Sequence, residues 1–487
     1  MRRRKVRIQS ETEARPLQPL RLRMLSSDQC MEFHEASLRI LSEAGVRFFK
    51  EEALDLLRKH GACVEGNLVR IPRELVEESL ESCPKQFPWK GFGDETSVTV
   101  KHEPLVSPAV GPVFIQDIKN GRREADETDY ANLIKLMHTL EIFSINGGLL
   151  IEIGKLPPER KYLVMMESML RHTNKPILGF CLEEPLIRQT LGFYEAATGD
   201  SCIWDKGHYL AAVCTALSPL AMPEDTIDTI IEYASRNQIL LITSCIMAGI
   251  TGPIHPLGTA LLQHAEILSG IVLAQCVRPG CPVVYSVAST AGYMQDASFG
   301  GGSPDAMMIN GPCIQTAIDL YDIPIRTMTG INSAKDTDYQ AGMETGMSAL
   351  LSGLIGGGIW PQAMGVLDDI MTLSYEKLIL DSDTLSRAMH VRKGFEFSVE
   401  ALSVDSIMEV GPQGNFLTHA DTFKNFRKLW TPEYMSWESR GAWEERGSAS
   451  LLEKANQAYS QILQESPDTL LSPDQEKRVT RAVAEYS

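Results

Sequence analysis

Three consecutive segments decide the fold of this chain: STAGYMQDASFGGGSPD at 289–305, TGINSAKDTDYQAGMETGMSALL at 329–351 and GGGIWPQAMGVLDD at 356–369. In each, apolar residues run into a loop of glycine and polar residues, and long helical patterns separate the apolar runs. Apolar runs whose carboxyl ends open into such loops are typical of the catalytic face of a parallel α/β barrel. The rest of the chain must supply the other strands.

The same alternation of strand and helix continues on the amino-terminal side of these segments. Strands that alternate with helices pair in parallel through right-handed crossovers, and eight such units favour a closed (β/α)₈ TIM barrel over an open sheet. No GxGxxG follows the first strand, so a dinucleotide-binding fold lacks its strongest support. The predicted strands are Val113–Ile118, Phe143–Leu150, Pro176–Leu182, Leu210–Leu217, Ile239–Ala248, Pro282–Ser289, Pro324–Gly330 and Gly358–Met364.

The predicted domain organisation has three parts. Residues 1–110 form an N-terminal helical cap, residues 111–395 the barrel, and residues 396–487 a C-terminal extension that wraps the barrel or a partner subunit. The cap differs from the barrel because helical patterns dominate it, and the extension because turn formers precede a charged helix. Outside the barrel, helices are expected at 27–60, 72–83 and 448–465, and a short strand at 67–71.

Composition excludes several classes of function. The 46 basic and 63 acidic residues give a net charge of −17, which argues against nucleic acid or an anionic membrane as the main partner. No uncharged apolar stretch reaches the length of about 18 residues that a membrane-spanning helix needs, and no apolar segment follows the basic start. The ten cysteines show no CxxC spacing, which indicates reduced thiols in a cytoplasmic protein. None of them are spaced as the closely clustered ligands of a zinc site would be.

The loops after the predicted strands hold few of the usual catalytic groups. Lys335 follows the seventh strand, where it would form a Schiff base or hold a carboxylate, although an exposed loop lysine is the simpler interpretation. Gln340 and Glu344 share one helix face four residues apart, as catalytic or merely capping side chains. Asp368 and Asp369 would bind a cation or cap the next helix.

Aromatic and glycine residues are more suggestive of a binding site. Aromatic faces attract quaternary ammonium groups through cation–π contact, although each ring is also a candidate for ordinary core packing. Gly300, Gly301 and Gly302 permit close backbone approach, either to a flat cofactor or as hinges. On the following helix, Gly342, Gly346 and Gly353 predict close packing against the barrel. The aromatic candidates are Phe180, Tyr293, Phe299, Tyr339, Trp360 and Phe416.

Three motifs together match a known family. DTDYQAGME at 336–344, AMGVLD at 363–368, and GPQGNFL at 411–417 followed by His419 resemble the trimethylamine methyltransferase family. The resemblance covers most of the chain, from the helical N-terminus through the tail. It is specific because the first and third motifs occur together.

The resemblance implies both a fold and a reaction. Members of the family are similar to (β/α)₈ barrels that move a methyl group from a methylamine to the cobalt of a separate corrinoid protein. Archaeal trimethylamine enzymes carry pyrrolysine, whereas this chain has only the twenty standard residues. Relatives without pyrrolysine resemble methyltransferases of quaternary amines, glycine betaine being the best known. Cobalamin would arrive on the partner protein, because the chain has no D-x-H-x-x-G run.

A quaternary amine explains the sparse catalytic inventory. Its nitrogen already leaves as a neutral amine, so Co(I) attacks a methyl carbon without help from an acid or a metal, and the enzyme supplies orientation and desolvation. Aromatic rings would form the cage, Gly300, Gly301 and Gly302 would admit the corrinoid, and Lys335, Gln340 and Glu344 are the catalytic candidates. The expected substrate-binding residues are Phe180, Tyr293, Phe299, Asn332, Trp360, Phe416 and His419.

The leading hypothesis is therefore a cytoplasmic methyltransferase that converts glycine betaine to dimethylglycine, with a corrinoid protein as partner. Carnitine, proline betaine and γ-butyrobetaine are alternative substrates, and a homo-oligomer is compatible with the sequence. A non-catalytic binder of quaternary amines and a lyase or aldolase that uses Lys335 are alternatives of another class.

Overall fold

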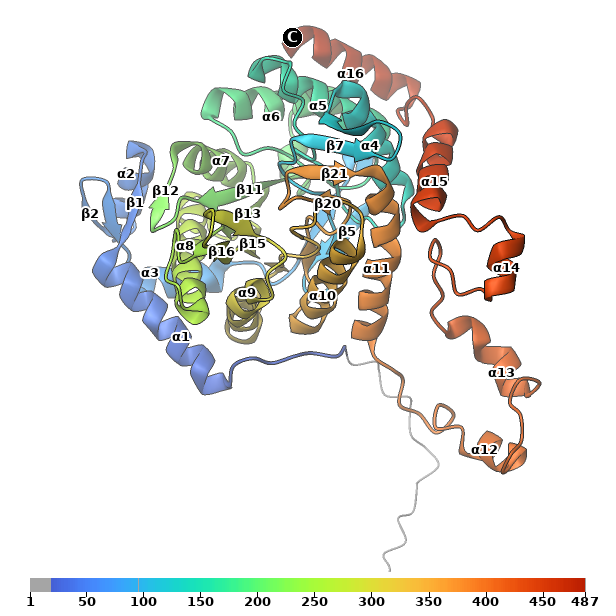
Figure 1. Cartoon of the computed structure of the whole chain (residues 1–487). Helices are drawn as coiled ribbons and strands as arrows, with labels where there is room; N and C mark the ends of the chain where they lie inside the picture. Colours follow the sequence, from blue (N-terminus) through green and yellow to red (C-terminus); the bar gives the residue numbers. More distant parts are fainter. Residues whose placement is uncertain (1–18, 95, 487) are drawn as a thin grey trace, which may run out of the picture.

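The centre of the protein is a closed barrel of eight parallel strands inside a ring of helices (Figure 1). The computed structural model describes residues 19–94 and 96–486. Strands β11 and β13 are the longest, and they consist of apolar and β-branched residues that are buried almost throughout, as expected of a parallel sheet covered on both faces. The barrel strands are β6 (Leu105–Val106), β9 (Asn146–Gly147), β10 (Ile177–Leu178), β11 (Leu210–Ala216), β13 (Ile239–Ser244), β15 (Val283–Val287), β18 (Ile325–Arg326) and β19 (Ile359–Trp360).

The barrel closes at its first strand. β6 pairs in parallel with β19 on one side. On the other side Val106 bridges to Phe143, and its carbonyl accepts hydrogen bonds from the N–H groups of Ser144 and Ile145 at 2.9 and 3.1 Å. The predicted (β/α)₈ barrel, with its helical N-terminal extension and wrapping C-terminal tail, is confirmed.

One predicted barrel strand was assigned wrongly. The run at 113–118 does form a strand, β7 (Phe114–Asp117), but β7 pairs with β8 (Gly121–Glu124) and β21 (Thr372–Ser374) in a separate sheet that also holds β20 (Val366–Leu367). The first barrel strand is β6, which lies before residue 111. It is only two residues long and is followed by prolines, so it gives no periodic signal.

A helix follows each barrel strand and packs on the outside of the sheet. Helix α4 begins at a capping box in which Asp126 and Asp129 each accept a hydrogen bond from the backbone of the other residue. Gly199, in the left-handed conformation, ends α6. The eight helices are α4 (Glu127–Thr139), α5 (Pro158–His172), α6 (Glu184–Thr198), α7 (Glu224–Ser235), α8 (Pro256–Val277), α9 (Asp305–Thr316), α10 (Tyr339–Ile355) and α11 (Tyr375–Lys393).

The N-terminal extension covers the outer face of α8. This helix is apolar on all sides, and its length and composition alone would suit a membrane span, but 89% of its apolar window is buried. Helices α1, α2 and α3 pack against α8, which explains the absence of a polar face. The extension holds α1 (Ser27–Arg39), the π-helix η1 (Ile40–Ala44), β1 (Val46–Phe48), α2 (Glu51–Lys59), β2 (Cys63–Glu65), β3 (Leu68–Arg70) and α3 (Arg73–Ser82), and β1 pairs with β12 (Ala221–Met222).

A hairpin closes the amino-terminal end of the barrel. β4 (Phe87–Lys90) and β5 (Ser97–Val100) place Phe87 and Trp89 against the apolar side chains inside the barrel, in a cluster separate from the main core. The Trp89 indole N–H donates to the carbonyl of Tyr209, just before β11, at 3.1 Å. Access to the interior is therefore confined to the carboxyl end of the strands.

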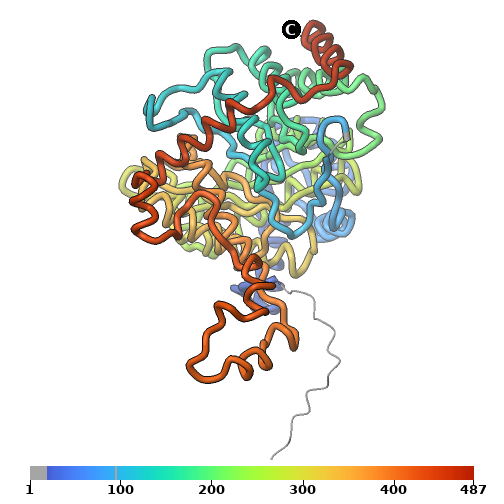
Figure 2. Tube along the Cα trace, turned by 90° about the vertical axis from the view of Figure 1, so that its right-hand side faces the viewer, coloured from blue at the N-terminus to red at the C-terminus, as the bar shows by residue number. Residues whose placement is uncertain are grey.

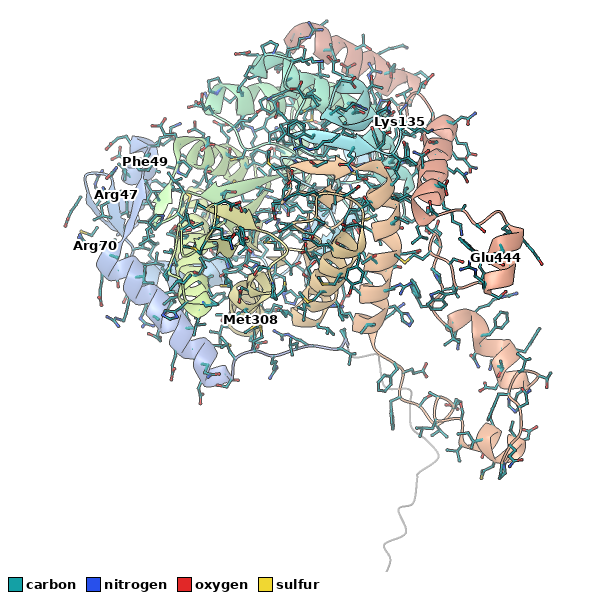
Figure 3. All side chains as sticks on the ribbon, viewed as in Figure 1. Arg47, Phe49, Arg70, Lys135, Met308 and Glu444 are labelled. Atoms are coloured by element: carbon teal, nitrogen blue, oxygen red, sulfur yellow. The ribbon has the colours of Figure 1, made fainter. Side chains whose placement is uncertain are left out.

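The C-terminal extension first leaves the barrel and then returns to it. Residues 395–429, with α12 (Val404–Val410) and α13 (Ala420–Asn425), project from the body as an arm (Figures 1 and 2). The arm exposes several large apolar side chains, among them Phe423 at 81%. Beyond α14 (Arg440–Glu445), the chain returns as α15 (Leu451–Glu465) on α11 and α16 (Pro473–Tyr486) on α6. In Figure 3, side chains fill the space between the layers of the body.

Candidate active site at the carboxyl end of the barrel

The inside of the barrel changes from apolar to polar toward the carboxyl ends of the strands. Leu241 and Val284 belong to the apolar layer above the hairpin. Two positions further along each strand, Thr243 and Ser286 also point inward, because side chains alternate between the faces of a strand. The Thr243 hydroxyl donates to Ser286 Oγ at 2.7 Å. A polar layer therefore lies at the base of the mouth.

Arg326 completes this polar layer with an unpaired positive charge. It is paired with Ser286 in the register of β15 and β18, and its side chain is 2% exposed. Its Nη1 donates to Ser286 Oγ at 3.0 Å and its Nη2 to Gln362 Oε1 at 3.3 Å. Nε has no partner, and no carboxylate of the described residues lies within ion-pair distance. Burial lowers the pKa of Arg326 to about 10, which leaves it charged at neutral pH.

A hollow lies above the polar layer. The inward-facing residues Val213, Thr215 and Ala288 are half-buried, and Cys245 is exposed, although all four lie inside the ring of strands or at its end. Burial nevertheless raises the pKa of Cys245 to about 11, against the opposing effect of Arg326. A thiol that touches solvent while protein atoms crowd around it lines a recess, and this thiol is protonated at neutral pH.

An apolar pocket opens at the carboxyl ends of β6, β9, β10 and β11. It encloses about 100 Å³, and no charged side chain lines it. Phe180, 4% exposed, follows β10, and Tyr162 reaches it from α5; their ring centroids are 5.0 Å apart at an interplanar angle of 55°. Val110 and Val213 join the pocket to the inside of the barrel. Two aromatic rings therefore meet at the mouth, and the Lys161 ammonium lies 4.9 Å from the centroid of the Tyr162 ring.

Three loops are joined by hydrogen bonds on the other side of the mouth. The Gly301 N–H donates to Asp369 Oδ1 at 2.9 Å, and the Ser333 hydroxyl donates to the same oxygen at 2.6 Å. The Gly302 N–H donates to Ser333 Oγ at 3.1 Å, and the Ser333 N–H donates to Glu344 Oε2 at 2.7 Å. This rim network connects the hairpin of β16 (Thr290–Tyr293) and β17 (Ser298–Gly300) to the loops after β18 and β20.

The loop that carries Asp369 has a strained backbone. Asp368, Asp369 and Ile370 have φ values of 54°, 51° and 83°, in the left-handed region that a β-branched residue strongly disfavours. Such strain costs about 1 to 3 kcal/mol per residue and is commonly found at functional sites. The strain places both carboxylates toward the loop after β18, where Lys335 Nζ lies 2.7 Å from Asp368 Oδ1 and 3.5 Å from Asp369 Oδ2.

The predicted catalytic residues belong to this rim. Partial desolvation of Lys335 is outweighed by its two aspartate partners, which raise its pKa. An ammonium held in this way is a poor Schiff-base nucleophile, so the geometry disfavours the lyase alternative. Gln340 Nε2 donates to Glu344 Oε1 at 2.9 Å, so the predicted pair does share a helix face. A Cβ on Gly302 would overlap the Glu344 carboxylate, which fills the space above this glycine.

The predicted binding residues are spread over five places. Phe180 lines the apolar pocket, whereas Tyr293, 50% exposed, and Phe299 lie on the hairpin of β16 and β17. Asn332 is buried, and its amide N–H groups donate to the carbonyls of Val366 and Gly330 at 2.7 and 3.2 Å. Trp360 is buried on the outer side of β19, where it packs against Gly353 of α10.

Phe416 and His419 lie on the projecting arm. Their rings are 6.0 Å apart, and His419 Nε2 is 3.6 Å from Glu409 Oε2. In the described part of the chain, the hydrogen bonds and ion pairs of residues 395–429 stay within the arm. The structure thus brings Phe180 and the rim residues to one end of the barrel, and it does not bring Phe416 or His419 into contact with them.

Sequence reasoning missed Arg326, Cys245 and Tyr162. Arg326 and Cys245 lie within predicted strands and Tyr162 within a predicted helix, and none of the three belongs to a motif or loop from which the candidates were taken. One signal was available: the run PIRTMTG at 324–330 holds a single charge in a segment that otherwise matches a strand buried on both faces. A charge at such a position requires a partner or a ligand.

Comparisons with known proteins agree with this architecture. The chain is 31% identical to the glycine betaine methyltransferase of Desulfitobacterium hafniense, over 95% of this chain and 96% of that one. It is 32% identical to the proline betaine:corrinoid methyltransferase of Eubacterium limosum, over 81% and 83% of the two chains. The monomethylamine methyltransferase MtmB of Methanosarcina barkeri has a similar fold, with a TM-score of 0.54 at 12% identity over 95% of this chain and 87% of that one. A family model described as trimethylamine methyltransferase (MTTB) matches residues 2–486, and the chain therefore belongs to the MTTB family of methyltransferases.

Proposed function

We propose that this protein transfers one methyl group from glycine betaine to the Co(I) of a separate corrinoid protein, in the cytoplasm, and releases dimethylglycine. The observation that carries the proposal is the apolar pocket formed by Tyr162 and Phe180 at the open end of the barrel. An apolar cavity of about 150 Å³ holds a benzene molecule, so a pocket of about 100 Å³ suits the smaller trimethylammonium group. Similarity to a glycine betaine methyltransferase supports the choice of substrate.

The reaction balances without a proton or an external oxidant. The electron pair of Co(I) forms the new bond to the methyl carbon, the carbon–nitrogen bond breaks, and its electron pair stays on nitrogen. The products are methyl-Co(III) and the neutral tertiary amine of dimethylglycine. The pocket stabilises the fixed positive charge by cation–π contact and excludes water, so that one methyl is presented to the mouth.

The corrinoid protein must approach the same end of the barrel, because the β4–β5 hairpin closes the other end. Co(I) has to reach the methyl carbon in line with the breaking bond. The rim network of Gly301, Gly302, Ser333, Glu344 and Asp369 holds the loops that the partner would meet. Gly300, Gly301 and Gly302 would shape this face rather than admit the corrinoid, because Ala291, Ile331 and Glu344 fill the space beside them.

The test uses Co(I) cobalamin as methyl acceptor and a panel of quaternary amines. We expect methylcobalamin to appear together with dimethylglycine when glycine betaine is the donor. Phe180→Leu removes a face of the pocket and should lower kcat/KM by about 3- to 30-fold, since a desolvated cation–π contact contributes about 0.5 to 2 kcal/mol. Tyr339→Leu is the matched control, because Tyr339 is 87% exposed and lies outside the pocket.

Two results would contradict the proposal. Absence of methyl transfer from every amine, to cobalamin and to corrinoid proteins alike, would favour a non-catalytic binder. Faster transfer from proline betaine, carnitine or γ-butyrobetaine would keep the reaction and replace the substrate; the 32% identical proline betaine relative makes that amine the first to compare.

A further inference from the structure

The buried charge of Arg326 has no counter-ion in the described protein. A charged group that is taken out of water costs several kcal/mol unless an opposite charge and hydrogen bonds compensate it. Ser286 and Gln362 supply only neutral oxygen atoms, and Nε donates to nothing. Nearby buried cations are treated differently: Lys377, 2% exposed, has the carboxylate of Asp381 within 2.5 Å. Lys377 therefore has a carboxylate partner, whereas Arg326, in the polar layer at the base of the mouth, has none.

The surroundings of Arg326 orient the guanidinium and leave its buried Nε without a hydrogen-bond partner. The Ser286 hydroxyl, itself a hydrogen-bond acceptor for Thr243, and the Gln362 amide oxygen fix the two Nη atoms. Gln362 adopts a positive φ of 51° and is 7% exposed, so its position is set by the turn after β19. A guanidinium that is oriented in advance binds a carboxylate through two parallel hydrogen bonds at a smaller entropic cost.

Arg326 lies on the inner side of the barrel wall, because it pairs with the inward-facing Ser286 in the register of β15 and β18. The hollow above this layer is lined by the exposed Cys245. Arg326 belongs to β18, while the pocket is built on β10 and β11, three and four strands away around the barrel. An aromatic pocket and an unpaired cation are therefore carried by opposite parts of one barrel wall, an arrangement that suits the two charges of a zwitterion.

We propose that Arg326 binds the carboxylate of the substrate and thereby selects quaternary amines that carry a carboxylate over those that do not. This inference rests on the proposed function, and it names a residue of the same site that determines specificity. The carboxylate supplies the missing counter-ion, and the trimethylammonium group at the other end of the molecule enters the aromatic pocket. Glycine betaine meets both requirements, whereas choline and tetramethylammonium meet only one.

The first test compares substrates. For Arg326→Gln, kcat/KM with glycine betaine should fall by about 10- to 100-fold, the loss expected for hydrogen bonds between charged groups. The same parameter with tetramethylammonium should change little, so the ratio between the two substrates collapses. Arg392→Gln is the matched control: it removes another largely buried guanidinium, paired with Glu103 outside the barrel, and should leave the ratio unchanged. Equal losses for both substrates in Arg326→Gln would overturn the proposal.

The second test does not depend on turnover. Because Arg326 is unpaired, Arg326→Met should leave the Tm of the ligand-free protein unchanged or raise it, whereas removal of a structural arginine would lower it. Glycine betaine should raise the Tm of the original protein and not that of Arg326→Met. A Tm increase of equal size in both proteins would refute the role of Arg326. Binding that depends on Arg326 without any methyl transfer would refute the proposed function instead, so the two failures are distinguishable.

Discussion

The rim network is expected to depend on Asp369 more than on any other side chain. Its Oδ1 accepts from the Gly301 N–H and the Ser333 hydroxyl, and its Oδ2 lies 3.5 Å from Lys335 Nζ. Replacement of Asp369 by alanine removes all three contacts and leaves the strained backbone in place. Asp369→Asn keeps an acceptor oxygen and a residue type that tolerates the left-handed conformation.

The number and burial of these contacts determine how much unfolding free energy Asp369→Ala should lose. A hydrogen bond to a charged group contributes about 1.5 to 3 kcal/mol when buried, and Asp369 is 17% exposed, so the two bonds together should contribute about 2 to 4 kcal/mol. Lys335 is 68% exposed, and its ion pair adds at most about 1 kcal/mol. We therefore expect Asp369→Ala to lower the free energy of unfolding by about 2 to 4 kcal/mol and Asp369→Asn by about half as much.

Urea unfolding at neutral pH measures this loss through the transition midpoint, with the m-value as a check on cooperativity. Lys335→Ala is the control, with an expected change of about 0 to 1 kcal/mol. Hydrogen exchange at the Gly301 amide should accelerate in Asp369→Ala and not in Lys335→Ala. If both variants lost the same stability and the Gly301 amide kept its protection, Asp369 would act through the lysine and the rim network as described would be wrong.

Three further predictions concern other parts of the barrel. Trp360→Phe should lower the free energy of unfolding by about 1 to 3 kcal/mol and leave the KM for glycine betaine unchanged, because the indole packs outside the sheet. A raised KM with unchanged stability would instead place the Trp360 side chain in the binding site. Gly302→Ala should reduce methyl transfer and stability, because the added Cβ displaces the Glu344 carboxylate. In a double-mutant cycle, Glu344→Ala should restore the stability that Gly302→Ala loses. Additive losses would show that the two positions are not in contact. Burial lowers the pKa of His264 to about 3, so the neutral imidazole's contribution to stability is complete above pH 6.5 and is lost as the pH falls toward 3. The urea midpoint of His264→Gln should therefore fall less on acidification than that of the original protein. An equal fall in both proteins would contradict this.

The sequence predicts the barrel well where the strands are long. β11 was expected almost at its observed bounds and β13 at its observed start, although the predicted end, Ala248, lies beyond the observed end at Ser244. Long runs of β-branched and apolar residues between helices have few other interpretations. The first strand escaped prediction because β6 has only two residues and its pairing depends on Phe143 to Ile145, far along the chain. The longer strand β7, which follows β6 in the chain, was predicted as the first barrel strand instead.

The glycines of α10 show a second limit of the sequence. Close packing against the barrel was expected for three glycines, and Gly353 does pack against Trp360 of β19. Nothing, however, lies within 4 Å of a Cβ placed on Gly342, and only a Thr384 methyl approaches Gly346. Glycine in an exposed helix costs about 1 kcal/mol, so packing against the barrel does not explain these two positions. Met308, labelled in Figure 3 on the neighbouring α9, is likewise 53% exposed.

The candidate site, too, contains residues that the sequence predicts and residues that it does not. Residues that follow the strands were predicted from topology alone, and Lys335, Glu344 and the glycines of 300–302 do meet at the rim. The floor of the site was not predicted, because only the register of β15 and β18 places Arg326 beside Ser286. Which aromatic rings face the substrate also depends on register, so Phe180 and Trp360 were equally good candidates from sequence.

The most direct measurement follows the methyl group itself. Glycine betaine with deuterated N-methyl groups is incubated with the protein and Co(I) cobalamin, and both products are analysed by mass spectrometry. We expect methylcobalamin with one intact deuterated methyl, formed in equal amount to dimethylglycine that keeps the other two. Unlabelled methylcobalamin, or dimethylglycine formed without methylcobalamin, would contradict direct transfer from the quaternary nitrogen to cobalt.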